Sequence, residues 1–288
     1  MALRIGTSGW AYDDWQGTVY PPSLAQSERL RWYATQFPTV EVDSTYYRDP
    51  APSVVQGWVE RTRGSPGFEL SVKAPQTLTH EALVNAEPTV CAQLTEAWTA
   101  LVARPLAQAR RLGAVLLQLS PAVIHGPEAL ARLDAALSAL APLDVAVEFR
   151  NRSWHDEAGT ALRPDALALL GEHCSAAVIV DGPSFPDIIA EQSSVRHAYV
   201  RFHGRNREDW FRRGASTTER YDYLYDDEEL EPWATRLAEL ARSKDVVRTY
   251  FNNHVEGKAF QNARTMERML ADVGAPLERA VSPQRRLF

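Results

Sequence analysis

The feature that most constrains the fold is a regular alternation of short β-rich runs with helical patterns along the whole chain. The β-rich runs are Leu3–Thr7, Thr39–Val42, Phe68–Lys73, Ala114–Leu119, Asp144–Phe149, Ala176–Val180, His197–His203 and Val246–Phe251. Apolar residues at helical spacing fill the segments Leu24–Phe37, Val54–Arg61, Pro127–Leu140, Leu162–His173, Leu230–Ser243 and about Gly257–Val273. Because a crossover helix returns the chain to the same edge, the eight strands are predicted to be parallel. We therefore expect an α/β fold, a single (β/α)8 TIM barrel over residues 1–288.

A doubly wound open sheet is the alternative interpretation of this alternation. It requires a glycine-rich phosphate-binding turn after the first strand, and residues 6–9 (GTSG) are too short for that fingerprint. One crossover differs from the others, because residues 87–111 are too long for a single helix and include Pro105. We expect two helices or a kink in that segment.

Composition narrows the class of protein. The 288 residues carry a formal net charge of -6, which argues against a broad basic surface that coats nucleic acid. Cys91 and Cys174 are the only cysteines and lack CxxC spacing, so we expect a reducing, cytoplasmic compartment. The N-terminus has no basic region followed by an apolar run, and no apolar stretch reaches the ~20 residues that cross a bilayer. We expect neither a signal peptide nor a membrane partner.

Several strands carry polar side chains at every second position. The polar sets are Glu41 with Asp43, Glu69 with Ser71 and Lys73, Glu148 with Arg150, and Tyr199 with Arg201 and His203. Helices cover the outer face of a barrel, so these polar faces are expected to point inward. At the C-terminal ends of the strands, where barrel enzymes carry their active sites, they would form a charged pocket. The alternative is a structural ion-pair network inside the barrel.

Six blocks of the sequence, in order along the chain, resemble a known family. They are residues 6–10 (GTSGW) with Tyr12 and Trp15, 40–48 (VEVDSTYYR), 68–75 (FELSVKAP) with His80, 148–151 (EFRN) with Ser153 and Trp154, 199–206 (YVRFHGRN), and 251–254 (FNNH) with Gly257, Ala259, Asn262 and Ala263. They resemble the YecE-like family, the domain of unknown function 72. The resemblance implies a TIM barrel and supplies neither an activity nor a cofactor.

Lys73, Glu148 and His203 form the predicted catalytic set. Lys73 is a candidate Schiff-base amine, base or anion clamp if burial lowers its pKa. Alternatively, it forms a salt bridge to Glu41 or Glu148. His203 is a candidate general acid or base, and we expect the Glu148 carboxylate to raise the pKa of His203.

The same histidine belongs to a candidate metal set with His254, Glu148 and Asp181, because imidazoles and carboxylates suit zinc or manganese. No HxH or HExxH spacing supports this set, so we predict no metal ligand.

The other candidates are expected to bind the substrate: Trp10, Tyr12, Glu41, His80, Arg150, Asp181, Arg201, Asn253 and His254. Residues 252–254 (NNH) precede the last helix, where backbone N–H groups often bind phosphate in barrels. A capped turn without a ligand is the alternative there. The loop 204–220, rich in arginine and aromatic residues, is either a lid over an anionic substrate, a surface that grips nucleotides, or a solvated loop.

Three functions fit these residues. The favoured hypothesis is a metal-independent enzyme that uses general acid–base catalysis on a small anionic or sugar-like substrate. The second is a nucleic-acid processing or repair enzyme, with or without a metal ion. The third is a non-catalytic protein that binds a small molecule. Fold alone does not choose among them.

Overall fold

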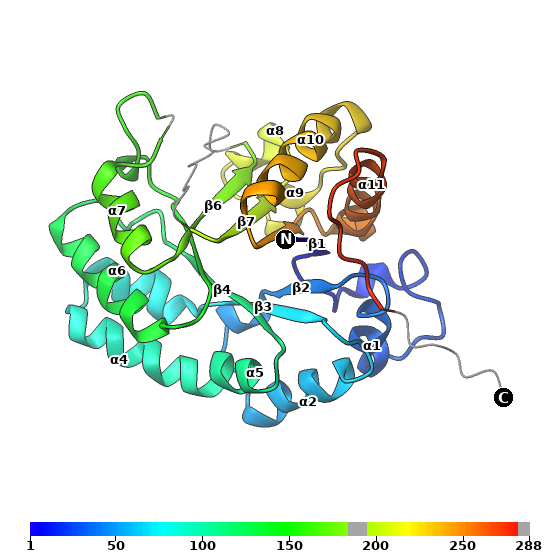
Figure 1. Cartoon of the computed structure of the whole chain (residues 1–288), viewed down its shortest axis with the longest axis horizontal. Coiled ribbons are helices and arrows are strands. Elements are labelled where there is room, and N and C mark those ends of the chain that lie inside the picture. Colours follow the sequence, from blue (N-terminus) through cyan, green and yellow to red (C-terminus); the bar gives the residue numbers. More distant parts are fainter. Residues whose placement is uncertain (160, 184–194, 282–288) are drawn as a thin grey trace.

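The computed structural model describes residues 1–159, 161–183 and 195–281, and its strands form one eight-stranded sheet. The strands are β1 (Ala2–Thr7), β2 (Thr39–Val42), β3 (Glu69–Lys73), β4 (Leu112–Gln118), β5 (Val145–Glu148), β6 (Ala176–Asp181), β7 (His197–Phe202) and β8 (Val246–Phe251). Their order is β1-β8-β7-β6-β5-β4-β3-β2, and each neighbouring pair in that order is parallel. The predicted (β/α)8 barrel is confirmed (Figure 1).

The barrel closes between β1 and β2 through a short contact. The Gly9 N–H donates to the Glu41 carbonyl at 2.7 Å, and Ser8 forms an isolated parallel bridge with Glu41. Gly6 permits this approach, because a Cβ at this position would lie 2.2 Å from the Thr39 carbonyl oxygen. The close approach of β1 and β2 therefore explains on steric grounds why residue 6 is a glycine.

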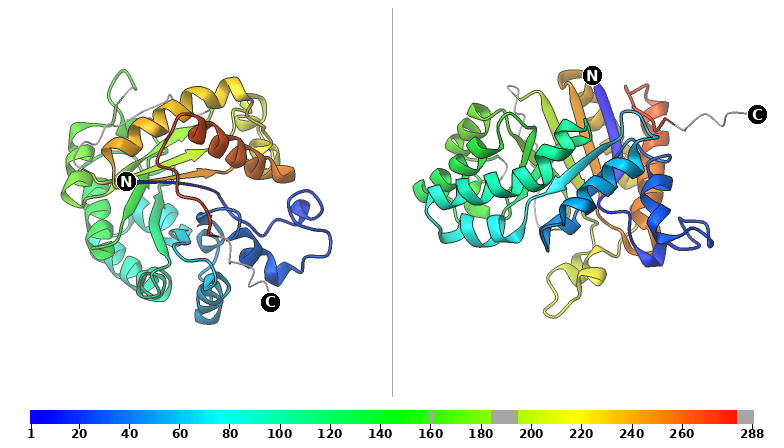
Figure 2. Two further views of the ribbon diagram at one scale, coloured as in Figure 1. Left: turned by 45° about the vertical axis from the view of Figure 1, so that its right-hand side comes forward. Right: turned by 90° about the horizontal axis from the view of Figure 1, so that it is seen from below.

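Helices surround the sheet (Figure 2, left). They are α1 (Arg29–Tyr33), α2 (Pro52–Thr62), α3 (Leu83–Asn85), α4 (Pro88–Trp98), α5 (Arg104–Gln108), α6 (Pro127–Leu140), α7 (Pro164–Glu172), α8 (Arg207–Trp210), α9 (Thr217–Tyr221), α10 (Asp227–Ser243) and α11 (Lys258–Asp272). Residues 87–111 contain α4, a wider π-type turn over Thr99–Ala103, and α5 with Pro105 in its first turn. The helical run is therefore continuous from Pro88 to Gln108, and its two α-helices meet at the π-type turn, in agreement with the expectation of two helices or a kink. In the described part of the chain, no helix has both the length and the hydropathy needed to span a bilayer.

The interior of the barrel is layered. At the N-terminal ends of the strands, Arg248 donates to Glu69 at 3.0 Å and to Asp144 at 2.9 Å. In the middle, Tyr199 and Tyr250 pack with ring centroids 5.0 Å apart, among small and aliphatic side chains. The C-terminal layer is polar and leads into a pocket. The two polar layers thus lie at opposite ends of an apolar middle.

The segment between β7 and α10 contains α8 and α9 and projects beyond the barrel. In the right-hand view of Figure 2 this segment is yellow and lies at the end opposite the N-terminus. It therefore covers the C-terminal ends of the strands. The sequence predicts one loop over residues 204–220, whereas this segment contains α8 and most of α9 in the structure. Asp226 and Ser216 begin α10 and α9 with capping boxes, which accounts for where these helices start.

Candidate functional site

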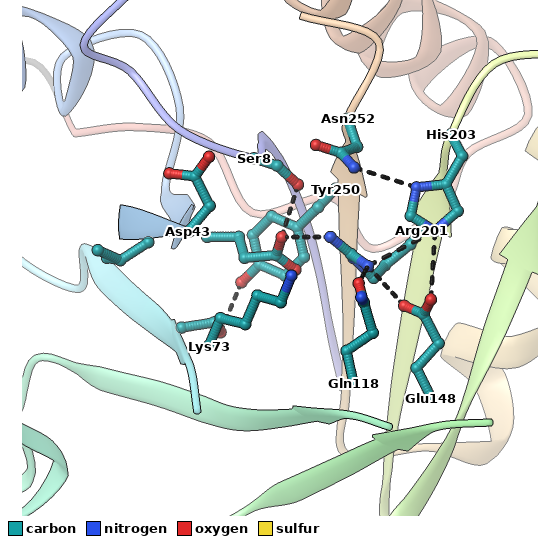
Figure 3. Close-up of polar contacts among 12 residues, drawn as sticks. Ser8, Asp43, Lys73, Gln118, Glu148, Arg201, His203, Tyr250 and Asn252 are labelled. Atoms are coloured by element: carbon teal, nitrogen blue, oxygen red, sulfur yellow. Dashed lines mark hydrogen bonds and ion pairs between the residues drawn. The ribbon is translucent and has the colours of Figure 1, made fainter. Parts of the chain in front are cut away.

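Arg201, on the inward face of β7, occupies the centre of the polar layer (Figure 3). Its guanidinium donates to Glu41 at 2.8 Å, to Glu148 at 2.5 Å and to Gln118 at 2.9 Å. Burial disfavours its charge, but the Glu41 and Glu148 carboxylates raise the pKa of Arg201 well above its usual range. The guanidinium is therefore a fixed positive charge between two strands' carboxylates.

Glu148 connects Arg201 with Arg150, whose Nε contacts the second carboxylate oxygen. Burial alone would raise the pKa of Glu148, but Arg150 and Arg201 hold it well below its usual range. This carboxylate is fully buried, and both its oxygens face arginines. Glu148 therefore stays ionised and positions the two guanidinium groups, and it is unsuited to accept a proton near neutral pH.

A pocket of about 530 Å³ opens above this layer. Its lining residues come from the ends of seven strands, all except β6, and from the loops that follow them: Tyr12, Asp43, Tyr46, Tyr47, Lys73, Gln118, Pro121, Arg150, Arg201, Trp210, Arg220, Tyr221, Asn252 and His254. Four of these are cationic lysine or arginine and one is a carboxylate, so positive charge predominates on the walls. The rim is aromatic.

Lys73, the last residue of β3, extends its ammonium group toward Arg201 (Figure 3). Its Nζ lies 4.0 Å from the centroid of the Tyr46 ring. Among the described residues, no carboxylate forms an ion pair with it, so the alternative interpretation, a salt bridge to Glu41 or Glu148, is not observed. Burial and the nearby Arg201 lower the pKa of Lys73 to about 8, despite the opposing effect of Glu41. A sizeable fraction of this amine is therefore neutral near physiological pH.

Asp43 follows β2 on the same side of Arg201 as Lys73, away from Glu148 and His203 (Figure 3). Burial and the neighbouring Glu41 raise the pKa of Asp43. The Tyr12 hydroxyl lies 3.4 Å from its Oδ2. An amine with a lowered pKa and a carboxyl with a raised pKa thus line one cavity, and perturbed pKa values of this kind are typical of groups that exchange protons with a substrate.

The segment after β7 supplies the outer wall. Trp210 and Tyr221 pack edge to face with centroids 5.3 Å apart, and Tyr221 approaches His254 at 6.0 Å. Arg220 lies beside them on the pocket wall, and in the described chain its buried Nε has no hydrogen-bond partner. By contrast, Arg212 of the same segment pairs with Asp209 and lies outside the pocket.

His203 differs from its prediction. Burial and Arg201 lower its pKa to about 4 and outweigh Glu148, whose carboxylate lies 3.5 Å from Nε2. The other ring nitrogen, Nδ1, contacts the Asn252 amide at 3.1 Å. The expectation of a raised pKa is therefore corrected, because two guanidinium groups share the space with the single carboxylate. His203 is a neutral, buried residue beneath the pocket wall.

The structure brings together in the pocket wall the predicted catalytic residue Lys73 and some of the predicted binding residues: Tyr12, Arg150, Arg201 and His254. Glu41 lies directly below, where it also accepts hydrogen bonds from Ser8 and Tyr199, each at 2.7 Å. His80 lies behind Tyr46, with ring centroids 5.1 Å apart, and does not line the pocket. Trp10 packs against Trp58 at 6.2 Å, also outside it. Neither side chain lines the cavity.

Asp181 and Asn253 are the other two predicted binding residues that the structure places elsewhere. The Asp181 carboxylate accepts hydrogen bonds from Tyr225 at 2.7 Å, Trp233 at 2.8 Å and Arg205 at 2.6 Å, and so anchors the segment after β7. Asn253 is fully buried and donates to the Tyr223 carbonyl and the Asn262 side chain, both at 2.8 Å. Asp181 ends β6 and Asn253 follows β8 by two residues, and both side chains bind the segment after β7 or α11 rather than line the cavity.

At the turn that follows Asn253, a backbone N–H already binds a carboxylate of the protein itself. The Glu256 N–H donates to the Asp14 carboxylate at 2.7 Å, so an anionic side chain already sits beside the start of α11. Of the candidate metal ligands, His203 and Glu148 lie together, whereas Asp181 faces Arg205. In the described ranges, no group of three or more His, Cys, Asp or Glu side chains is arranged to hold a metal ion.

Some lining residues were not among the predicted site residues. Gln118 continues the inward alternation of Ala114 and Leu116 on β4, and that period could have identified it. Tyr46 and Tyr47 lie in a block that resembles the family, beside Asp43. Trp210 and Arg220 lie in the arginine- and aromatic-rich segment 204–220, and Asn252 in residues 252–254, which the sequence already marks as candidates. No periodic pattern predicts which side chains of these loops reach the pocket.

The fold and this pocket define an α/β-barrel protein with a charged, aromatic-rimmed cavity at the C-terminal ends of its strands. The chain belongs to the family described as "Protein of unknown function DUF72", which matches residues 4–286. This confirms the family that the sequence blocks resemble.

Curated relatives and solved structures agree with this assignment. The chain is 30% identical over 274 residues to the UPF0759 protein YunF of Bacillus subtilis (strain 168), covering 93% of this chain and 94% of that protein. The crystal structure of a DUF72 family protein from Thermotoga maritima MSB8 matches with a TM-score of 0.79 at 32% identity, over 94% of this chain and 100% of that one. A DUF72 family protein from Enterococcus faecalis V583 matches with a TM-score of 0.75 at 25% identity, over 93% and 95% of the two chains. None of these names states an activity.

Proposed function

We propose that this protein is an enzyme that binds a small anionic or sugar-like molecule in the pocket and transfers a proton to or from it. Lys73 and Asp43 exchange the proton, Arg150 and Arg201 hold polar oxygens of the substrate, and Arg220 closes on its anionic group. Glu148, Glu41 and His203 position the arginines from below.

The observation that carries this proposal is the charge imbalance of the pocket. The two guanidinium groups at its floor are neutralised by Glu41 and Glu148. Lys73 and Arg220 line the same cavity, and in the described chain neither has a carboxylate partner. Against these two cations the cavity holds one carboxylate, Asp43, so its walls keep an excess of positive charge that favours an anionic ligand. The aromatic rim suits the flat face of a ring or sugar.

Thermal unfolding with and without small anions tests this proposal. Phosphate, pyrophosphate, oxalate and citrate are each compared with chloride at constant ionic strength, because a ligand that binds only the folded protein raises its Tm. We expect at least one of these anions to raise the Tm. The Arg220→Gln variant should lose most of this increase. The matched control, Arg212→Gln, removes a charge from the same segment outside the pocket and should retain it.

The proposal fails if none of these anions raises the Tm. It also fails if Arg220→Gln and Arg212→Gln respond as the wild-type protein does, because the anion would then bind elsewhere. Isothermal titration with the same two variants provides an independent readout of the dissociation constant.

A further inference from the structure

The chain uses lysine very sparingly. Of 31 lysine and arginine residues, only Lys73, Lys244 and Lys258 are lysines, and the other 28 are arginines. Lys244 donates to the Val195 carbonyl at 2.7 Å, and Lys258 pairs with Asp222 and Glu256. Lys73 alone lines the pocket described above. Arginine would serve as an anion clamp as well or better there, because its guanidinium is always charged and binds oxygens in pairs.

What lysine offers and arginine does not is a neutral amine with a free electron pair. The surroundings of Lys73 favour that form. Burial and the guanidinium groups of Arg150 and Arg201, which Glu148 holds in place, disfavour a further positive charge on its Nζ. These effects outweigh the Tyr46 ring, whose face favours the ammonium. At neutral pH, on the order of 100 times more of Lys73 is unprotonated than of an ordinary lysine, given a pKa of about 8.

We propose that Lys73 forms an imine with a substrate that carries both an aldehyde or ketone and an anionic group. This inference rests on the proposed function, because Arg220 and the arginines of the floor must bind the anionic group. The pocket then presents the carbonyl carbon to Nζ while the aromatic rim limits access of water.

The chemistry balances within the site. The electron pair of the neutral Lys73 amine forms a bond to the carbonyl carbon, and the π electrons of the C=O bond move to its oxygen. A proton passes from the nitrogen to that oxygen, giving a carbinolamine. Asp43 in its protonated form supplies the proton that departs with the hydroxyl group as water, and the nitrogen electrons form the C=N bond of a protonated imine. One water is released for each imine formed.

Reductive trapping tests this inference. The probe is pyridoxal 5′-phosphate, an aldehyde that carries a phosphate, and pyridoxal is the control that lacks it. Borohydride converts each imine into a stable amine, and peptide mass spectrometry compares Lys73 with the two internal controls, Lys244 and Lys258. We expect roughly tenfold more adduct at Lys73 than at Lys258, because a desolvated amine is the more reactive one. Labelling of Lys73 should fall with pyridoxal and when inorganic phosphate competes.

Variants distinguish the imine at Lys73 from the proposed binding of an anion. Lys73→Arg keeps the charge and should abolish the adduct at this position. Arg220→Gln should reduce labelling of Lys73, and Arg212→Gln should not. Adduct spread equally over the lysines, with anion-dependent stabilisation still present, overturns the imine and leaves the proposed function standing. Labelling of Lys73 that is equal with both aldehydes and insensitive to phosphate overturns the anionic substrate class. Absence of both adduct and stabilisation overturns the imine and the proposed function together.

Discussion

At the scale of single residues, His203 illustrates how neighbours decide a charge state. Its ring lies 3.5 Å from the Glu148 carboxylate, yet burial and Arg201 lower its pKa to about 4. The neighbour that the sequence made visible, Glu148, favours the imidazolium. The neighbour that prevails, Arg201, is two residues away on the same strand, and its effect depends on how deeply the whole group is buried.

This pKa predicts a pH dependence of stability. Between about pH 6.5, the ordinary pKa of histidine, and about pH 4, the unfolded chain binds a proton at His203 that the folded protein excludes. The free energy of unfolding should therefore fall as the pH drops through that window. Urea unfolding at pH 7 and pH 5 measures it. The His203→Gln variant should lose less stability over this interval than the wild-type protein, and equal losses in both would contradict the assignment.

At the scale of elements, the segment between β7 and α10 is held to the barrel by Asp181, at the end of β6. Its buried carboxylate accepts hydrogen bonds from Arg205, Tyr225 and Trp233. This segment then carries Trp210, Arg220 and Tyr221 to the pocket. Asp181 therefore contributes to the candidate site indirectly, by fixing the path of a loop.

Replacing this anchor should loosen the segment. Asp181→Asn replaces one oxygen by an NH2 group, so two donors lose their acceptor and Arg205 loses its ion pair. We therefore expect a loss of at least about 1–3 kcal/mol in the free energy of unfolding. Hydrogen exchange should accelerate in residues 204–225 and remain unchanged in β3 and β4 on the other side of the barrel. Faster exchange throughout the chain, or in neither region, would show that Asp181 does not act as a local anchor.

The sequence was most informative about the periodic elements. The alternation of period two placed Lys73, Glu148 and Arg201 on inward faces, since a strand's side chains have only two directions. It was least informative past the strand ends. Asp181 is in register with Phe202 on the outward face, and Asn253 has the parity of Phe251, so the alternation itself indicates that both side chains point away from the barrel interior. Arg220 reaches the pocket from a non-periodic segment. Contacts of that kind depend on tertiary packing between distant parts of the chain.

At the scale of the whole molecule, the barrel separates stability from binding. The N-terminal layer pairs Arg248 with Glu69 and Asp144, far from the pocket across the tyrosine layer. Barrels generally carry their chemistry at the C-terminal face and structural contacts at the other. The two polar layers of this protein are therefore expected to respond differently to substitution.

A pair of variants tests that separation. Glu69→Gln weakens the N-terminal layer and should lower the free energy of unfolding by about 1–3 kcal/mol while leaving the dissociation constant for the stabilising anion unchanged. Arg220→Gln should weaken binding of the anion and leave the free energy of unfolding unchanged. Chemical denaturation and isothermal titration on the same samples provide both quantities. Weaker anion binding in Glu69→Gln would show that the two layers are coupled.

The proposals for this pocket depend most directly on one property, namely that the Lys73 amine titrates near neutral pH in a cavity that binds an anion. Reductive methylation with ¹³C-formaldehyde labels the three lysines, and their NMR signals can be followed from pH 6 to pH 11. The Lys73→Arg variant identifies the signal that belongs to Lys73. We predict that this signal titrates with a pKa of about 8 and that the stabilising anion moves the pKa upward, because a bound negative charge favours the ammonium. A Lys73 signal that titrates above about pH 10, with no response to any of the anions, would contradict the account.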